Sequence, residues 1–331
     1  MANAIPMVEL WRGGLLESSH WGHAVICDAK GDIVSSWGDP AAVIFPRSSC
    51  KMLQALPLIE SGAADAADLT EAQVALSCAS HLGAAVHTDM VTRWLGDLGL
   101  SESDLRCGPQ EPDDRQARDG LIRAYEAPCQ IHNNCSGKHS GFLTLNKHLN
   151  AGSEYTEVDH PVQKAVRDAF EDMTGETSPG FGIDGCSAPN FATSLHGLAR
   201  AMARFATASD SGDARNRAAY RLTRAMISHP ELVQGAGGAD TELMRAMGGR
   251  VATKNGADGV YVAIVPELRL GIALKIMDGA ARAKEAAIAA LLVHVGALDA
   301  NHPVTLGRLG VDLHNRRGLR FGELRISDGF S

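Results

Sequence analysis

A serine and a lysine stand three residues apart in the segment 46–56, and together they could act as a nucleophile and its base. Residues i and i+3 are neighbours on a helix surface, so Ser48 and Lys51 would point the same way. A serine can use a lysine as its base, and the N–H groups of a helix N-terminus would help to stabilise an oxyanion. Alone, the motif is weak, because an N-cap serine beside a surface lysine has the same letters. The helix is predicted from apolar residues at helical spacing, namely Met52, Leu53, Leu56 and Ile59.

Two further motifs follow in the order used by penicillin-recognising serine hydrolases, which combine S-x-x-K, S-D-N and K-T-G. Ser80 ends a predicted helix in the run Cys-Ala-Ser-His, and a Lys-Asn-Gly run begins at Lys254, before a predicted hairpin. An N-cap serine and a solvated turn lysine are the simpler interpretations of each motif alone. A protonated lysine cannot be a base, but burial or a second cation favours the neutral amine. Whether Lys51 or Lys254 accepts the first proton stays open, with Ser80 as a candidate relay.

A second group of residues has the chemistry of a metal site. Cys135 and Lys138 stand at i and i+3 at a predicted helix start, and Cys186 lies in the loop Asp-Gly-Cys. Two thiolates suit Zn²⁺ well, whereas a lysine ligand is rare because its amine must be neutral. Buried thiols beside a loop lysine are the alternative interpretation.

Composition excludes several classes of partner. The 331 residues carry a formal net charge of −8 and show no basic stripe, so nucleic acid is not an expected partner. No apolar run approaches the ~20 residues needed to cross a membrane. The chain starts without a signal-peptide pattern, and its seven cysteines are scattered and odd in number. We therefore expect a cytoplasmic protein with reduced thiols.

Strand signals cluster at the two ends of the chain, and helix signals lie between them. Hairpins are predicted at 23–37 and 260–276 and a last strand at 322–326, whereas 107–133 and 180–189 read as irregular. Helices are predicted to start near 48 and 136 and to occupy 69–77, 87–98, 191–207, 213–228, 241–247 and 279–297, with another from Pro161. We expect one domain over 1–331, with an antiparallel sheet from about 8–40 and 250–331 and a mainly helical region at about 48–248.

Taken together, these motifs resemble the rhizobial-type, or class 3, L-asparaginases, a group also described as asparaginase II-like. The most specific part is the run Asn-Cys-Ser-Gly-Lys-His at 134–139 together with Asp-Gly-Cys at 184–186. The resemblance extends over most of the chain and is carried by the runs at 11–20, 47–51, 78–81, 106–108, 134–139, 184–186, 229–231 and 254–258.

The resemblance implies an α+β fold like that of serine β-lactamases and hydrolysis of L-asparagine to L-aspartate and ammonia. It implies Ser48 as the nucleophile, with Lys51, Ser80 and Lys254 in Ser–Lys arrays. It also implies a homodimer and a metal site, usually zinc, made of Cys135, Lys138 and Cys186. Because a serine nucleophile is present, we expect the metal to position groups rather than to generate the nucleophile.

A zwitterionic amino acid needs one anion and one cation in its pocket. Asp184 is the candidate for the α-ammonium group and Arg47 for the α-carboxylate, although a structural salt bridge is an equal alternative for Arg47. His139 could orient a metal ligand or a water, and backbone N–H groups at Ser48 and near Gly256 could hold the oxyanion.

Three rival functions stay open at this point. The chain could be a β-lactamase or penicillin-binding-like serine amidase. It could prefer glutamine, because one methylene is worth only about 1–3 kcal/mol of discrimination. It could also be a zinc-binding protein without catalysis.

Overall fold

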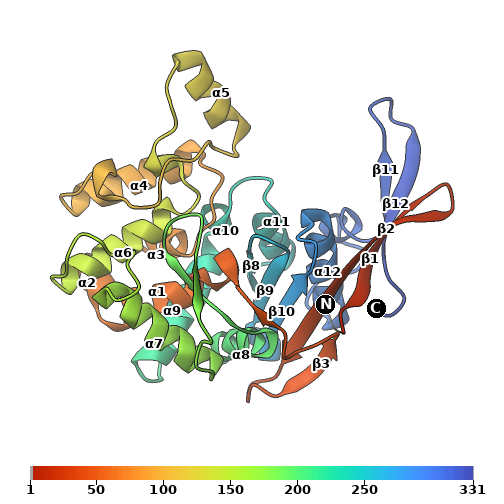
Figure 1. Cartoon of the computed structure of the whole chain (residues 1–331), viewed down its shortest axis with the longest axis horizontal. Coiled ribbons are helices and arrows are strands. Elements are labelled where there is room, and N and C mark those ends of the chain that lie inside the picture. The colour runs from red at the N-terminus through yellow and green to blue at the C-terminus, as the bar shows by residue number, and fades with distance from the viewer. Residues whose placement is uncertain (1–2, 331) are drawn as a thin grey trace. The chain divides into compact units, whose positions relative to one another are not determined.

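The two ends of the chain form one antiparallel sheet of eight strands in the computed structural model, which describes residues 3–330. Seven strands follow the order β11-β12-β1-β2-β10-β9-β8, and β3 pairs with β2. Figure 1 shows the red N-terminal strands beside the blue C-terminal ones. The predicted sheet is therefore confirmed. Its strands are β1 (Ile5–Arg12), β2 (Leu15–Cys27), β3 (Ile33–Trp37), β8 (Ala252–Asn255), β9 (Val260–Val265), β10 (Leu270–Ile276), β11 (Val311–His314) and β12 (Arg320–Ile326).

Alternation along β10 explains how this sheet is covered by helices on both faces. Ile272 and Leu274 belong to a buried apolar cluster with residues of one helix, α12. Gly271 points the other way, and a Cβ there would lie 2.1 Å from the backbone nitrogen of Ala203 in α8. Glycine at this position thus permits the close approach of α8. The two helices are α8 (Leu195–Ala206) and α12 (Ala281–His294).

The described residues group into two compact units. The sheet unit contains the chain up to Ser49, the segment Thr193–Thr207 and the chain from Glu242 onward. Its minor elements are the pair β4 (Val43–Ile44) and β7 (Thr193–Ser194), and helix α13 (Pro303–Leu306). The helical unit contains Cys50–Ala192 and Ala208–Thr241. A single functional domain stays a prediction.

Helix α1 (Lys51–Glu60) is the central element of the helical unit. Every residue from Lys51 to Ile59 is buried, Pro57 included, and α1 packs against α6, α7 and α9. The motif-bearing start of α1 is therefore anchored in a core. The other helices are α2 (Ala63–Ala66), α3 (Glu71–Ser77), α4 (Ala85–Asp97), α5 (Arg115–Ala124), α6 (Ser136–His148), α7 (Pro161–Thr174), α9 (Ala214–Ser228), α10 (Pro230–Val233) and, across the boundary of the units, α11 (Ala239–Ala246).

Besides several very short elements, three segments contain regular structure that the sequence did not indicate. Helix α5 lies in the stretch expected to be irregular, capped by Asp114, whose side chain accepts from the Ala117 N–H. None of its residues is buried, and Leu121 and Ile122 are the only large apolar residues in this strongly polar segment. Short strands β5 (Phe181–Ile183) and β6 (Pro189–Phe191) pair around the Asp-Gly-Cys loop, and β11 is a second strand of the tail.

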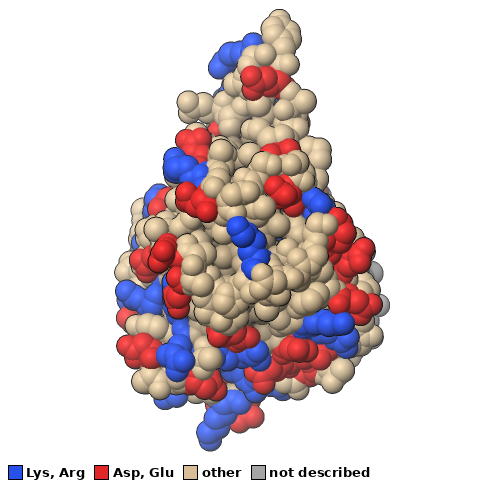
Figure 2. All heavy atoms as spheres, turned by 90° about the vertical axis from the view of Figure 1, so that its left-hand side faces the viewer, with Lys and Arg blue, Asp and Glu red and all other residues tan. Residues whose placement is uncertain are grey.

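Acidic and basic side chains are interspersed on the face shown in Figure 2, without a continuous basic area there. That face therefore lacks the basic stripe that is typical of a nucleic-acid-binding surface. Within residues 3–330, each helix is too short or too polar to cross a bilayer.

Candidate active site

Ser48 lies in a tight turn that precedes α1, and not in the α-helix itself. The 3-10 helix η1 (Arg47–Cys50) forms this turn. Ser49 closes it, because both its N–H and its hydroxyl donate to the Pro46 carbonyl, at 3.2 and 2.7 Å. The position of the predicted nucleophile is thus set by local backbone bonds.

The Lys-Asn-Gly segment packs directly on this turn within the sheet unit. Lys254 is on β8, is 0% exposed, and donates from Nζ to the Asn255 carbonyl at 2.8 Å. A Cβ on Gly256 would lie 2.8 Å from the Pro46 oxygen and 3.1 Å from the Ser49 nitrogen, so only glycine fits without a shift. Two of the three predicted motifs therefore meet. The Gly256 N–H itself donates to the Val260 carbonyl at 2.8 Å, so it is engaged.

Arg47 forms an ion pair with Asp258, which follows the glycine turn. Both residues have left-handed backbone, each with φ of 53°, a conformation that costs energy for non-glycine residues and is often found at functional sites. Lys275 also donates to the Asp258 carbonyl. The structure thus shows the salt bridge that the sequence left open for Arg47.

Lys51 connects three motif segments inside the helical unit. It is only 1% exposed, and Nζ donates to the carbonyl oxygens of Ala79 and, at 3.4 Å, Asn134. Because a buried amine needs such acceptors, Lys51 holds the start of α1 against the Ser80 loop and against the loop that precedes α6.

The backbone of Ser80 is fixed, but its hydroxyl has no hydrogen-bond partner among the described residues. The Ser80 N–H donates to the Val233 carbonyl at 2.9 Å. Its Oγ is buried, and no residue among 3–330 bonds to it. Leaving a buried hydroxyl unsatisfied costs about 1–3 kcal/mol, so this atom is suited to contact a substrate or a water.

Cys135, Lys138 and Cys186 come together in the helical unit, all buried. Lys138 Nζ donates to Cys186 Sγ at 3.0 Å. A hydrogen bond from Cys135 and the Lys138 ammonium hold the pKa of Cys186 below its usual range, although burial opposes this. Burial alone would lower the pKa of Lys138, but Cys186 and Cys135 raise it. The group is therefore a compensated thiolate–ammonium pair with a neighbouring thiol.

His139 follows this group and is oriented by a residue that the sequence did not indicate. Tyr155 accepts the Arg106 N–H at 2.8 Å, and its OH lies 2.9 Å from His139 Nδ1. If the tyrosine donates to Nδ1, the proton of the neutral imidazole is on Nε2. Burial lowers the pKa of His139, and Cys186 counters part of that shift. No pattern in the sequence links Tyr155 to His139.

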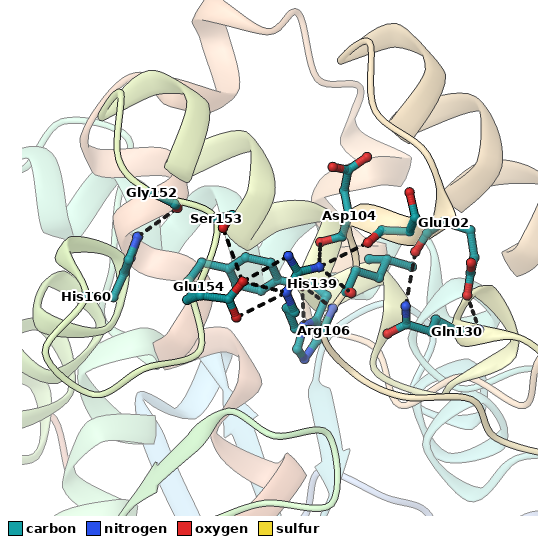
Figure 3. Close-up of polar contacts among 12 residues, drawn as sticks. Glu102, Asp104, Arg106, Gln130, His139, Gly152, Ser153, Glu154 and His160 are labelled. Atoms are coloured by element: carbon teal, nitrogen blue, oxygen red, sulfur yellow. Dashed lines mark hydrogen bonds and ion pairs between the residues drawn. The ribbon is translucent and has the colours of Figure 1, made fainter.

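Figure 3 shows how this support is held, with Arg106 between Glu154 on one side and the Glu102–Asp104 turn on the other. The guanidinium of Arg106 donates to both Glu154 oxygens and to the carbonyl oxygen of Asp104, among others. Arg106, held by these contacts, donates its N–H to Tyr155, and Tyr155 in turn orients the ring of His139.

The donor atoms fit a zinc ion in kind but lack a third His, Cys, Asp or Glu. Across residues 3–330, no three side chains of those types are grouped to hold a metal. The predicted set has two thiols and Lys138, and His139 Nε2 is buried without a hydrogen bond inside the described chain. In the tautomer above, Nε2 would donate toward a thiolate rather than bind a metal. This agrees with an orienting role for His139.

Asp184 lies in the loop of the β5–β6 hairpin, two residues before Cys186. It is half-buried, its N–H donates to the Ala188 carbonyl at 3.0 Å, and its carboxylate accepts from the Gly185 N–H. Its negative charge contributes to raising the pKa of Lys138. The candidate ammonium-binding residue is thus next to the predicted metal site.

Comparisons with known proteins identify a family for this chain. A profile of the family described as L-asparaginase II matches residues 8–326. Curated proteins yield no match. Among solved structures, Mglu in its glutamate form is 13% identical at a TM-score of 0.50, covering 84% of this chain and 61% of that one. A β-lactamase from Mycobacterium bovis is 14% identical at a TM-score of 0.44, covering 84% of this chain and 95% of that one. The predicted mixed fold, with an antiparallel sheet from both ends of the chain and helices between, is confirmed.

Proposed function

Because the chain belongs to the L-asparaginase II family, we propose that it hydrolyses L-asparagine to L-aspartate and ammonia. Family membership supports an amidohydrolase, and the proposal adds the substrate and the Ser–Lys mechanism. The observation that carries it is the packing of the Gly256 turn on the Ser48 turn. It joins a Ser-x-x-Lys segment to a lysine-bearing strand, as a serine nucleophile with a lysine base requires.

In the proposed reaction, Ser48 Oγ attacks the side-chain carboxamide carbon and loses its proton to a neutral lysine, Lys51 or Lys254. The resulting oxyanion is stabilised by backbone N–H groups, with the Ser48 amide as the candidate because that of Gly256 is engaged. The proton passes to the amide nitrogen, with Ser80 as relay, and the C–N bond breaks to release ammonia. Water then hydrolyses the aspartyl ester on Ser48.

Asp184 and Arg47 are proposed to select an amino-acid substrate. Asp184 would bind the α-ammonium group, and Arg47 the α-carboxylate. Arg47 would have to share its guanidinium with Asp258 or leave it. A bidentate guanidinium has donors enough for both carboxylates when their geometry allows it.

Zinc is proposed at Cys135, Lys138 and Cys186, with His139 orienting one of the ligands. A bound zinc ion would supply a fixed positive charge that positions polar groups. In this structure the Lys138 ammonium group donates a hydrogen bond to Cys186 Sγ, so Lys138 must release a proton before it can bind a metal. We also propose that the protein is a cytoplasmic homodimer. Size-exclusion chromatography with light scattering tests the dimer by its molar mass.

The test is ammonia release from L-asparagine and, separately, from L-glutamine by wild type and by Ser48→Ala. We expect asparagine turnover in the wild type and its loss in the variant, with glutamine as the poorer substrate. Equal turnover of both amides would remove the assigned specificity. A folded wild type that releases no ammonia but hydrolyses nitrocefin would replace the proposal with a lactamase activity.

A further inference from the structure

A buried lysine on α12 contacts the backbone of the glycine turn. Lys284 is 9% exposed, and its Nζ donates to the Gly256 carbonyl at 2.6 Å. It also lies 3.5 Å from the side-chain oxygen of Asn255. All three residues belong to the sheet unit. The long side chain of Lys284 thus links a helix to the turn that follows β8.

The surroundings make this lysine unusual for its helix. On α12, Ala283, Ala286, Ala287 and Ile288 are buried in the apolar cluster of the sheet unit. An ammonium group in such a place is costly unless its donors are satisfied. An apolar residue would suffice for packing here, so the distinctive feature of Lys284 is the hydrogen bond of its ammonium group to the turn.

The turn is fixed on three sides at Gly256. Its carbonyl accepts from Lys284, its N–H donates to Val260, and its Cα faces Pro46 and Ser49 at a distance that excludes a Cβ. A shift of the Gly256 peptide would therefore displace either β8, which carries Lys254, or the turn that carries Ser48. The carbonyl is the one of these three contacts that depends on a side chain.

We propose that Lys284 is a positioning residue for the reaction: by holding the Gly256 carbonyl it fixes the β8 turn against the Ser48 turn. This inference rests on the proposed function. Lys284 acts through the backbone and does not touch the substrate. Its loss should lower kcat more than it raises KM, because Lys284 contacts neither group assigned to the substrate: Arg47 belongs to the Ser48 turn, and Asp184 belongs to the helical unit.

The test compares Lys284→Met, which removes the donors at similar length, with Lys284→Arg, which keeps them. An ångström-scale misplacement can cost on the order of 100-fold in rate, so we expect a roughly 10- to 100-fold fall in kcat for the methionine variant. The arginine variant should recover most of it. Lys30→Met, at an exposed turn lysine, is the control and should match wild type.

Two readouts are independent of turnover. Hydrogen exchange at the Gly256 amide should be faster in Lys284→Met, and labelling of Ser48 by a fluorophosphonate should be slower, both restored by arginine. A folded Lys284→Met protein with wild-type exchange, labelling and kcat would overturn the inference. So would a parallel rise of KM with the fall in kcat. If wild type turns over no asparagine, the proposed function fails, while exchange and labelling still decide the role of Lys284.

Discussion

Lys138 Nζ lies 3.0 Å from Cys186 Sγ, and both side chains are buried. The ammonium group compensates the thiolate without a metal, as a buried charge requires. Helix α6, which carries Lys138, and the loop that carries Cys186 can therefore keep their places when zinc is absent. A metal that only positions groups could therefore be removed without complete loss of activity, whereas a metal that generates the nucleophile could not.

We predict that zinc-depleted protein stays folded and keeps part of its activity. Ammonia release should fall roughly 10- to 100-fold, as for lost support of a metal site. In contrast, Ser48→Ala should cost on the order of 10⁶-fold. Metal content and ammonia release are measured before and after chelation. Cys186→Ala should resemble the depleted enzyme, and Cys129→Ala should resemble wild type. Equal losses on chelation and in Ser48→Ala would show that the metal drives the chemistry.

Ser80→Ala should lose activity without losing stability. Its Oγ has no hydrogen-bond partner among residues 3–330, so the substitution removes an unsatisfied buried group. We expect kcat to fall about 10²- to 10⁴-fold, the range for a lost proton-transfer group, with an unchanged or raised Tm. Ser77→Ala is the matched control, because Ser77 Oγ donates to Val74 at 2.7 Å. It should lose about 1 kcal/mol of stability. A Ser80→Ala variant with a lower Tm and full activity would contradict the proposed role of Ser80 as a proton relay.

Two substitutions distinguish a substrate-binding role of Arg47 from a role in its ion pair with Asp258. If Arg47 binds the substrate carboxylate, Arg47→Gln should raise KM for L-asparagine roughly 10- to 100-fold, the value of a charged hydrogen bond. Asp258→Asn should leave KM near wild type or lower it, since the guanidinium gains freedom. Steady-state kinetics of both variants measure this. Similar effects of the two substitutions would show that Arg47 serves only its ion pair with Asp258.

Acid should destabilise the protein through His81. Burial holds the pKa of this imidazole well below 6.5, and the charges of His87, Lys51 and His132 act in the same direction. The unfolded chain therefore binds more protons below pH 6.5, so stability falls as pH falls. Each pH unit costs about 1.4 kcal/mol for one such group.

Urea unfolding of wild type and His81→Gln between about pH 6.5 and 5 measures this dependence. The variant should start less stable, because His81 Nε2 lies 2.9 Å from Ser136 Oγ. Its stability should nevertheless decline less steeply with acid than that of wild type. His148→Gln, at an exposed position, should keep the wild-type slope. Parallel slopes for all three proteins would mean that His81 is protonated in the fold.

Local sequence was sufficient for the parts of the fold and site that depend on neighbouring residues. The β-rich runs at both ends predicted the sheet, and the apolar spacing after Ser48 predicted α1, although Ser48 itself lies in the turn before that helix. Helix α5 has no buried residue and only two large apolar residues, Leu121 and Ile122, so its polar composition resembles that of a loop. The contact of Tyr155 with His139 arises from tertiary packing and leaves no spacing signal. Lys284 stands in an alanine-rich helix, where its letter gives no hint that it reaches Gly256.

The most direct test of the account is to trap the covalent intermediate. Acid quenching during turnover of L-asparagine, followed by peptide mapping by mass spectrometry, should find the mass of an aspartyl group on Ser48. Ser49→Ala should still be labelled at Ser48, and Ser48→Ala should carry no label. Undiminished asparagine turnover by Ser48→Ala, or an aspartyl group on another residue, would contradict the serine mechanism.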